Sequence, residues 1–149
     1  MKNTNKNHQN QHIPVLLNEV LTYLSPSEGE SYLDCTAGYG GHASKILERT
    51  LNPAKAVLID RDQNSIDHLH SIFKEGVRVV RNDYLRACSD LSKANEQFDM
   101  ILADLGVSSP HLDNASRGFS IRLDGPLDMR IDNDQQLTAE IIVNSYNEA

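Results

Sequence analysis

Apolar and polar residues follow two alternating patterns between residues 12 and 104. Four short apolar runs have the length of buried strands, and they lie at residues 31–36, 56–60, 77–82 and 98–104. Before and between these runs, apolar residues recur at helical spacing. The pattern predicts helices over 14–24, from the residue after Gly41 to near Asn52 and Pro53, around Ile66–Phe73, and over about 85–94.

The alternation of strands and helices is typical of an α/β fold built from βαβ units. We therefore expect a parallel sheet with flanking helices, whose right-handed crossovers place the carboxyl ends of all strands on one edge. Ligands of open α/β sheets bind outside that edge. The residues predicted to lie there are Asp34 to Gly41, Asp60, Asp83 with Tyr84, and Asp104.

The pattern changes after residue 105. Residues 106–110 and 112–136 lack apolar periodicity, and the second part is rich in aspartate and arginine, so we expect a long loop, either functional or a solvated linker. A last helix is predicted to start near Leu137, with no stop signal before Ala149. Four strands make a small sheet for this architecture, and we expect the fold to be truncated after the fourth strand, which would then be an open edge.

Length and composition limit the kind of protein. A chain of 149 residues with 39% hydrophobic residues suits one globular domain and has no stretch suited to crossing a membrane. Its net charge of −7 argues against a protein that coats polyanions, but not against an enzyme that modifies RNA. Residues 1–11 are polar, lack the apolar core of a signal peptide and are expected to be disordered. Cys35 and Cys88 form no disulfide ladder, which favours a reduced, cytoplasmic chain.

A glycine-containing turn follows the first predicted strand and opens the next helix. Its pattern, Gly38-x-Gly40-x-x-Ala43, occurs in nucleotide-binding turns, where glycine permits a positive φ and close approach of a ligand. Asp60 lies at the end of the second strand, where a carboxylate can accept hydrogen bonds from ribose hydroxyls. The alternative role for Asp60 is the N-cap of the following helix.

The acidic residues at the strand ends bear on which nucleotide binds. A dinucleotide would bring a pyrophosphate close to Asp34, which would repel it. S-adenosylmethionine carries an ammonium and a sulfonium, and Asp34 and Asp104 would attract these cations. Asp83 and Tyr84 would flank its adenine, with the carboxylate near the amino group and the ring stacked on the base. The residues therefore favour S-adenosylmethionine over the dinucleotide of a nicotinamide-dependent oxidoreductase.

Six sequence blocks occur in an order that resembles a known family. They are His12-x-Pro14-Val-Leu-Leu, Asp34-x-Thr-x-Gly38-x-Gly-Gly-His42, Asp60-Arg-Asp62, Asp104-Leu-Gly-Val-Ser-Ser109, Arg117-Gly-Phe-Ser120 and Asp124-Gly-Pro-Leu-Asp-Met-Arg130. Together they resemble the MraW/RsmH family, bacterial methyltransferases that modify N4 of a cytidine in the 16S ribosomal RNA of the small subunit. The resemblance implies a Rossmann-like class I methyltransferase with S-adenosylmethionine as cofactor and 16S rRNA as partner.

The resemblance also implies where the cofactor contacts lie. They fall on Gly40, Gly41, His42, Asp60, Tyr84, Asp104 and His111, beside the Asp34, Gly38 and Asp83 indicated by the strand ends and the glycine turn. The family more often has Phe where Tyr84 stands, and stacking is expected to survive that change. It usually has Gln where His111 stands, and a hydrogen bond is expected to be kept. For His42, the alternative is a first-turn residue with its ring in solvent.

The implied chemistry is an in-line displacement at a sulfonium methyl group, which needs no metal and depends on alignment. We expect Asp104 to accept an N4–H bond from the cytosine and to take its proton, with a role in cofactor binding alone as the alternative. Arginines of the later segment are candidates for contacts with RNA phosphates: Arg117, Arg122 and Arg130. Alternatively, they pair with acids of the same segment, such as Asp113, Asp124 and Asp128.

Members of the family are longer than this chain and insert a helical subdomain after the fourth strand. The resemblance therefore divides the chain into an incomplete cofactor-binding domain at 12–110 and the start of the inserted, substrate-facing region at 111–149. We expect weak or no methyl transfer from these 149 residues alone. A non-catalytic fragment that binds the cofactor is the alternative to an enzyme.

Overall fold

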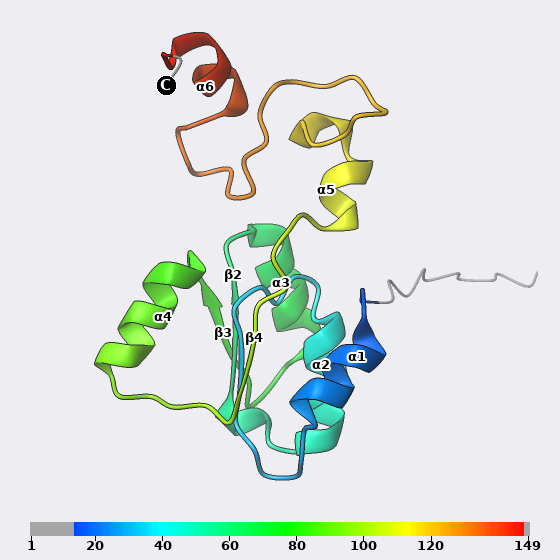
Figure 1. Ribbon diagram of the computed structural model, residues 1–149, viewed down its shortest axis with the longest axis vertical. Helices are drawn as coiled ribbons and strands as arrows, with labels where there is room; N and C mark the ends of the chain where they lie inside the picture. The colour runs from blue at the N-terminus through cyan, green and yellow to red at the C-terminus, as the bar shows by residue number, and fades with distance from the viewer. Residues whose placement is uncertain (1–13, 148–149) are drawn as a thin grey trace, which may run out of the picture.

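Four parallel strands form the centre of the molecule, as the apolar runs predict. The computed structural model describes residues 14–147, so the predicted tail at 1–11 lies outside the described residues. The strands β1 (Tyr32–Asp34), β2 (Ala56–Asp60), β3 (Arg78–Arg81) and β4 (Met100–Leu102) have the order β3-β2-β1-β4 (Figure 1). Leu33 in the central β1 pairs with Val57 of β2 and with Ile101 of β4. The α/β prediction is confirmed, although β1, β3 and β4 are shorter than their apolar runs.

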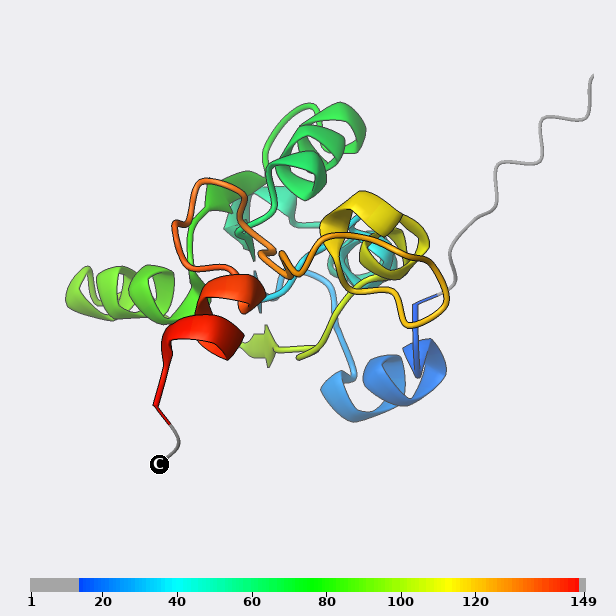
Figure 2. The ribbon, with the colours of Figure 1, turned by 90° about the horizontal axis from the view of Figure 1, so that it is seen from above.

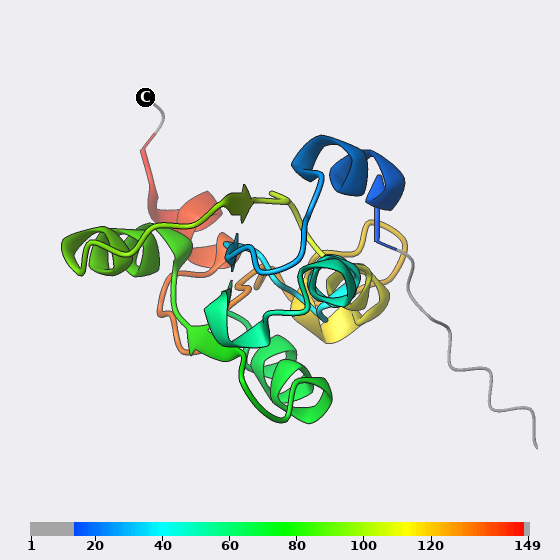
Figure 3. The ribbon, with the colours of Figure 1, turned by 90° about the horizontal axis from the view of Figure 1, so that it is seen from below.

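Helices cover both faces of the sheet. α1 (Leu17–Leu24), α2 (Gly41–Thr50) and α3 (Gln63–Ile72) pack on one face, and α4 (Tyr84–Lys93) packs on the other (Figures 1 and 3). Because side chains alternate along a strand, Leu58 of β2 enters the core under α1–α3, whereas Val57 and Ile59 enter the core beside α4. A short 3-10 helix, η1 (Pro53–Lys55), leads from α2 into β2.

The helices that leave the carboxyl edge begin in two different ways. Asp62 caps α3 by accepting the backbone N–H of Asn64 at 3.0 Å, and Asp83 caps α4 by accepting that of Leu85 at 2.8 Å. α2 begins after the glycine turn, where Gly40 has a φ of +77°. A Cβ on Gly40 would lie 2.9–3.0 Å from side chains of α3 and of the residue after it. Glycine is therefore required at this position by both conformation and space.

The segment after β4 lies beyond the carboxyl edge of the sheet (Figures 1 and 2). It contains α5 (Ser109–Asp113), the 3-10 helix η2 (Ala115–Arg117) and α6 (Ala139–Ser145). α6 agrees with the helix expected from Leu137, whereas the prediction of one long loop missed α5 and η2. α5 lacks apolar periodicity and is instead held by a capping box between Ser108 and His111. No helix within residues 14–147 is long and apolar enough to cross a membrane.

Candidate functional site

The carboxyl ends of the three neighbouring strands β2, β1 and β4 are hydrogen-bonded to one another through the predicted site residues. The backbone N–H of Gly38 donates to Asp60 Oδ2 at 2.8 Å, which joins the glycine turn to the end of β2. The backbone N–H of Asp104 donates to Thr36 Oγ1 at 2.7 Å, which joins the end of β4 to the same turn. The structure thus brings Asp60, Asp104 and the glycine turn together at one edge, where ligands of such sheets bind.

Asp34 lies beneath this edge and faces the protein interior. Its side chain is 1% exposed and accepts hydrogen bonds from the Tyr32 hydroxyl at 2.7 Å and from the Thr36 N–H at 3.1 Å. Burial, together with the charges of Asp60 and Asp104, raises the pKa of Asp34 to about 6, although the two hydrogen bonds oppose this rise. Asp34 therefore supports the turn from below and adds negative charge to the site near neutral pH.

Asp60 is not a helix cap, so the alternative considered for it is wrong. The N-cap of α3 is Asp62, two residues later. Asp60 Oδ1 accepts the backbone N–H of Asp62 at 2.8 Å, while Oδ2 accepts that of Gly38. Its carboxylate is half-buried and fixed between the glycine turn and the start of α3.

The glycines of the turn have different roles. At Gly38, which has a φ of +52°, a Cβ would have no neighbour closer than 3.9 Å, so the space beside it is open to a ligand. Gly40 is needed for packing against α3, and a Cβ on Gly41 would collide with the ring of Pro14. Two of the three glycines thus allow α2 to approach its neighbours, which the nucleotide-turn pattern alone did not reveal.

His42 is buried in the first turn of α2, so the alternative of a solvent-exposed ring is wrong. The residue is 9% exposed, and its Nε2 lies 3.8 Å from Asp104 Oδ2. Its Nδ1 is buried and makes no hydrogen bond within the described chain. Burial lowers the pKa of His42, and the nearby Asp104 carboxylate partly opposes this effect. The ring is therefore mainly neutral at pH 7, and its Nε2 is the nitrogen that lies near Asp104.

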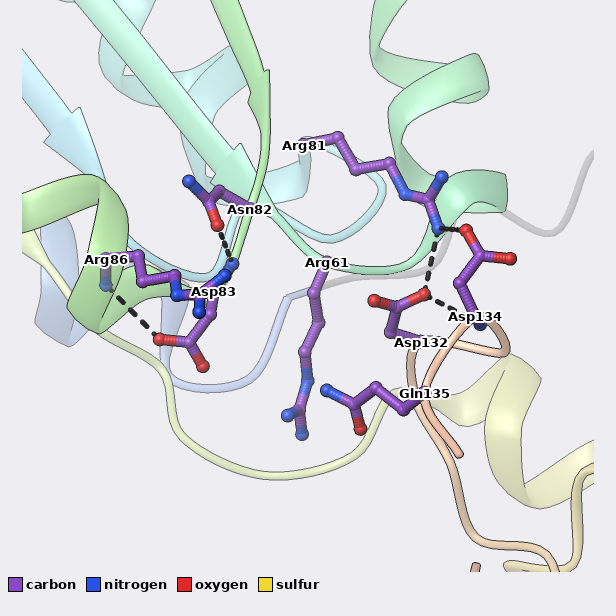
Figure 4. Close-up of a pocket in the computed structure, with 8 residues that line it drawn as sticks. All are labelled: Arg61, Arg81, Asn82, Asp83, Arg86, Asp132, Asp134 and Gln135. Atoms are coloured by element: carbon purple, nitrogen blue, oxygen red, sulfur yellow. Dashed lines mark hydrogen bonds and ion pairs between the residues drawn. The ribbon is translucent and has the colours of Figure 1, made fainter. Parts of the chain in front are cut away.

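A cavity of about 530 Å³ lies at the carboxyl ends of β2 and β3, beside Arg61, the residue after Asp60 (Figure 4). Its walls contain Asp83, which was predicted as a site residue, and further polar side chains that were not: Arg61, Arg81, Asn82, Arg86, Asp132, Asp134 and Gln135. Figure 4 shows Arg61 extending from the end of β2 between the walls of this cavity. Tyr84 follows Asp83 at the start of α4 and is 37% exposed. Arg61 could have been suspected from its place inside the Asp60-Arg-Asp62 block.

His111 and Arg117 converge on Asp62, a residue that the sequence-based prediction did not include. His111 Nε2 lies 2.7 Å from Asp62 Oδ2, and Arg117 Nη1 lies 3.3 Å from the same oxygen. Burial raises the pKa of Asp62, but the hydrogen bonds from His111 and Asn64 and the charge of Arg117 outweigh it, so this pKa lies below its usual value. This buried cluster ties α5 and η2 to the start of α3, directly after the Asp60 site.

Of the three arginines predicted to contact RNA, two are engaged by other residues of the chain and one is not. Arg117 also donates to the carbonyls of Arg130 and Ile131, and Arg130 pairs with Asp128 at 2.8 Å. Both hold residues 128–135, which we call the strap. Arg81 of β3 fastens the same strap through ion pairs to Asp132 and Asp134 at 2.8 and 2.6 Å (Figure 4). The guanidinium of Arg122 makes no ion pair or hydrogen bond with the part of the chain that the structure describes.

The donor set suits a cationic ligand. Two carboxylates line the edge, a third lies buried beneath it, and the imidazole Nε2 of His42 lies beside Asp104. A ligand with an ammonium and a sulfonium would be stabilised here, whereas a pyrophosphate would face negative charge. A parallel α/β sheet with a glycine turn after β1 and an acid ending β2 is a Rossmann-like arrangement. The further acid after β4 and the acidic edge are consistent with the methyltransferase class of this fold.

Comparison with known proteins identifies the family. The MraW methylase family matches residues 9–149. The chain is 43% identical over 147 residues to "Ribosomal RNA small subunit methyltransferase H" of Mycoplasma mycoides subsp. mycoides, which covers 93% of this chain and 46% of that relative. Proteins with the same name from Halothermothrix orenii and Gloeothece citriformis are 42% and 44% identical, and the matches cover 92% of this chain and 45% and 46% of those relatives. The chain belongs to the MraW methylase family and spans about half the length of these relatives.

Proposed function

We propose that this chain binds S-adenosylmethionine as part of a methyltransferase that acts on N4 of a cytidine in 16S rRNA. The observation on which this mainly rests is the edge formed by the glycine turn, Asp60 and Asp104, with acidic groups where a cationic methyl donor would lie. The relatives' name, a ribosomal RNA small subunit methyltransferase, supports the substrate. An rRNA substrate implies work in the cytoplasm, where small ribosomal subunits are assembled.

The cofactor would extend along the edge from β4 to β3. Asp60 would accept the ribose hydroxyls, because it ends β2 beside the open space at Gly38. The adenine would enter the cavity beside Asp83, and Tyr84 follows Asp83 in the chain. The methionine part would lie over the turn of Gly40 and Gly41, near His42 and Asp104, with Asp34 adding charge from below. His111 would affect this site indirectly, because it contacts Asp62, which lies two residues after Asp60 in the chain.

The chemistry would be an aligned displacement. When bound, S-adenosylmethionine supplies a methyl group on a positively charged sulfur. Asp104 has a side chain that is 57% exposed, so it can receive the amino group of a cytosine. By accepting an N4–H bond, its carboxylate would localise the nitrogen lone pair and then hold the proton that the nitrogen releases. The target base would first have to turn out of the folded RNA.

Contacts with RNA are proposed for the segment after β4. Arg122 has its guanidinium available for a phosphate, whereas Arg117 and Arg130 are engaged with the strap and would position it against the RNA. Since the chain spans about half of its relatives, their remaining half would share the RNA surface.

Calorimetric titration tests the cofactor assignment. S-adenosylmethionine and S-adenosylhomocysteine are expected to bind the chain, whereas NAD⁺ is not, because its pyrophosphate meets the acidic edge. Binding of NAD⁺ in place of S-adenosylmethionine would show that the proposal is wrong.

Transfer of a tritiated methyl group to 30S subunits tests the reaction, in a full-length family member that carries this segment. Asp104→Asn is expected to reduce transfer by about 100-fold, the usual loss when a general base is removed. Asp90→Asn, which alters a surface pair with Lys93 on α4, is the control and should leave transfer unchanged. Full activity of the Asp104 variant would refute the assignment of the base.

A further inference from the structure

Two cysteine thiols are in contact between the centre of the sheet and α4. Cys35 follows the last residue of β1, and Cys88 lies within α4. Their sulfur atoms are 3.7 Å apart, although the residues are 53 positions apart in the chain. Both are free thiols in the structure. The sulfur atoms of a disulfide bond are about 2.0 Å apart, so an approach of about 1.7 Å would join the two residues.

The backbone holds Cys35 in place, so α4 would make most of this approach. The N–H of Cys35 donates to the carbonyl of Leu102 in β4 at 2.9 Å. Asp34, just before it, pairs with Leu58 of β2 and with Leu102 of β4. α4 instead packs on the outer face of the sheet through its side chains (Figures 1 and 3). Packed helices slide by small amounts more readily than a strand that is bonded on both sides.

The two thiols differ in their access to solvent. Cys35 is 7% exposed, whereas Cys88 is half-buried and lines an open groove of about 610 Å³ between α4 and β4. A small oxidant can therefore reach Cys88 through the groove but not Cys35. Burial also raises the pKa of the Cys35 thiol, which keeps it protonated and unreactive toward an oxidant from solution. The first reaction is therefore expected at Cys88.

We propose that Cys35 and Cys88 form an oxidation site, in which hydrogen peroxide converts the two thiols to a disulfide bond that fastens α4 to the centre of the sheet. The Cys88 sulfur attacks one peroxide oxygen and the O–O bond breaks. Cys88 becomes a sulfenic acid, and the other oxygen leaves as water with the thiol proton. The Cys35 sulfur then attacks the Cys88 sulfur, the S–O bond breaks, and hydroxide leaves as water with the Cys35 proton. Two thiols are thus oxidised while one peroxide is reduced to two waters.

The position of Cys35 suits it to the second step. A sulfenic acid at Cys88 would have the Cys35 sulfur beside it, and a reactant held in contact acts at a high effective concentration. This contact works against the high pKa of Cys35, which slows the step because the thiolate is the stronger nucleophile. The sequence contains two cysteines, so no other thiol of the chain competes for the sulfenic acid. The inference does not depend on the proposed function.

Mass spectrometry of the folded chain after treatment with hydrogen peroxide tests the proposal. The expected product is a monomer that has lost two hydrogen atoms, and its digest should contain two peptides linked through Cys35 and Cys88. A reducing agent should restore the original mass. Amide hydrogen exchange in α4 should be several-fold slower in the oxidised chain, because the bond opposes local opening of the helix.

Substitutions separate the two steps. In Cys35→Ser the sulfenic acid at Cys88 has no thiol beside it and should be trapped by dimedone. In Cys88→Ser the buried Cys35 should stay unmodified. The matched control combines Cys88→Ser with Ser89→Cys, which moves the thiol to an exposed position about 100° around α4. This control should form no bridge within the chain.

The proposal would be overturned if both thiols of the folded chain stayed free, or if Cys88 became a sulfinic acid while Cys35 stayed a thiol. A disulfide between two chains through Cys88, in place of one within the chain, would overturn it too. So would a bridge in the Ser89→Cys control at the rate of the unchanged chain, because contact in the fold would then not direct the reaction. Circular dichroism identifies a variant that fails to fold, and the product of the unchanged chain decides the question without it.

Discussion

Carboxylates at the same edge of the sheet have different physical roles because their surroundings differ. Asp34 is 1% exposed and bonded to Tyr32, whereas the side chain of Asp104 is 57% exposed and has an imidazole as its neighbour. A buried carboxylate resists ionisation, and an exposed one stays available to a ligand. Asp34 is therefore suited to supporting the site, and Asp104 to the chemistry.

Asp34 should give the protein an unusual pH dependence of stability. Its pKa rises from 3.8 in the unfolded chain to about 6 in the fold, so the folded state binds the proton more tightly. The stabilisation is present below about pH 4 and is lost as the pH rises through 6, a change of about 3 kcal/mol. The measurement is the free energy of urea unfolding of the wild-type protein and of Asp34→Asn from pH 4 to pH 7.5. Over this range the wild-type protein should lose about 3 kcal/mol of unfolding free energy relative to the variant. A difference between the two proteins that does not change with pH would contradict the prediction.

The Asp62 cluster should tolerate glutamine at position 111 but not an apolar residue. His111→Gln can keep a donor toward Asp62 Oδ2, which His111 approaches at 2.7 Å. His111→Leu leaves a carboxylate that is 3% exposed with fewer partners, and should lower the free energy of unfolding by about 2–3 kcal/mol. Urea unfolding at pH 7 compares the two variants. If both variants lost the same free energy of unfolding, the contribution of His111 would come from the volume of its ring and not from its hydrogen bond to Asp62.

At the scale of elements, the contact between α2 and α3 depends on the glycine turn. Gly40 combines a φ of +77° with closely packed neighbours, whereas Gly29 has a φ of +87° and no atom within 4 Å of the place that a Cβ would occupy. A substitution at Gly29 therefore measures the cost of the positive φ alone, whereas a substitution at Gly40 measures that cost together with the cost of crowding.

Gly40→Ala should be more destabilising than Gly29→Ala. The strain of a positive φ costs alanine about 1 kcal/mol at either position, and crowding against α3 adds about 1–3 kcal/mol at Gly40 alone. The measurement is the midpoint and free energy of urea unfolding for both variants. If Gly29→Ala lost as much as Gly40→Ala, close packing would not be the reason for the glycine.

At the scale of the whole molecule, arginines join the segment after β4 to the sheet. Arg81 reaches the strap from β3, and Arg117 connects it to Asp62 at the start of α3. The cavity beside Arg61 has one wall from the sheet and α4 and one from the strap (Figure 4). The proposed adenine site is therefore built partly by residues distant in sequence.

Arg81→Leu should loosen the strap without unfolding the sheet. Two ion pairs to Asp132 and Asp134 are lost, so amide hydrogen exchange in the strap, residues 128–135, is expected to be several-fold faster. The control is Arg78→Leu, at the other end of β3, which removes only the surface pair with Glu96. Hydrogen exchange followed by mass spectrometry distinguishes the variants. Equal exchange in the strap would show that Arg81 does not hold it.

Chain order and local patterning already determined the sheet and its ligand-binding edge. Apolar runs and helical spacing place βαβ units one after another, and right-handed crossovers then place Asp34, Asp60 and Asp104 at one edge. These features depend on neighbours close in sequence. Six sequence blocks in order were likewise sufficient to indicate the family that the comparison confirms.

Only the tertiary structure decided which side chains face a ligand and which face the protein. His111 and Arg117 turn toward Asp62, 49 and 55 residues away, and the ring of His42 is buried beside Asp104. Burial and the choice of a partner depend on segments that meet only in the folded chain, and no local pattern encodes them. The sequence by itself therefore determined the sheet and its edge, whereas tertiary packing decided which of the edge residues are available for chemistry.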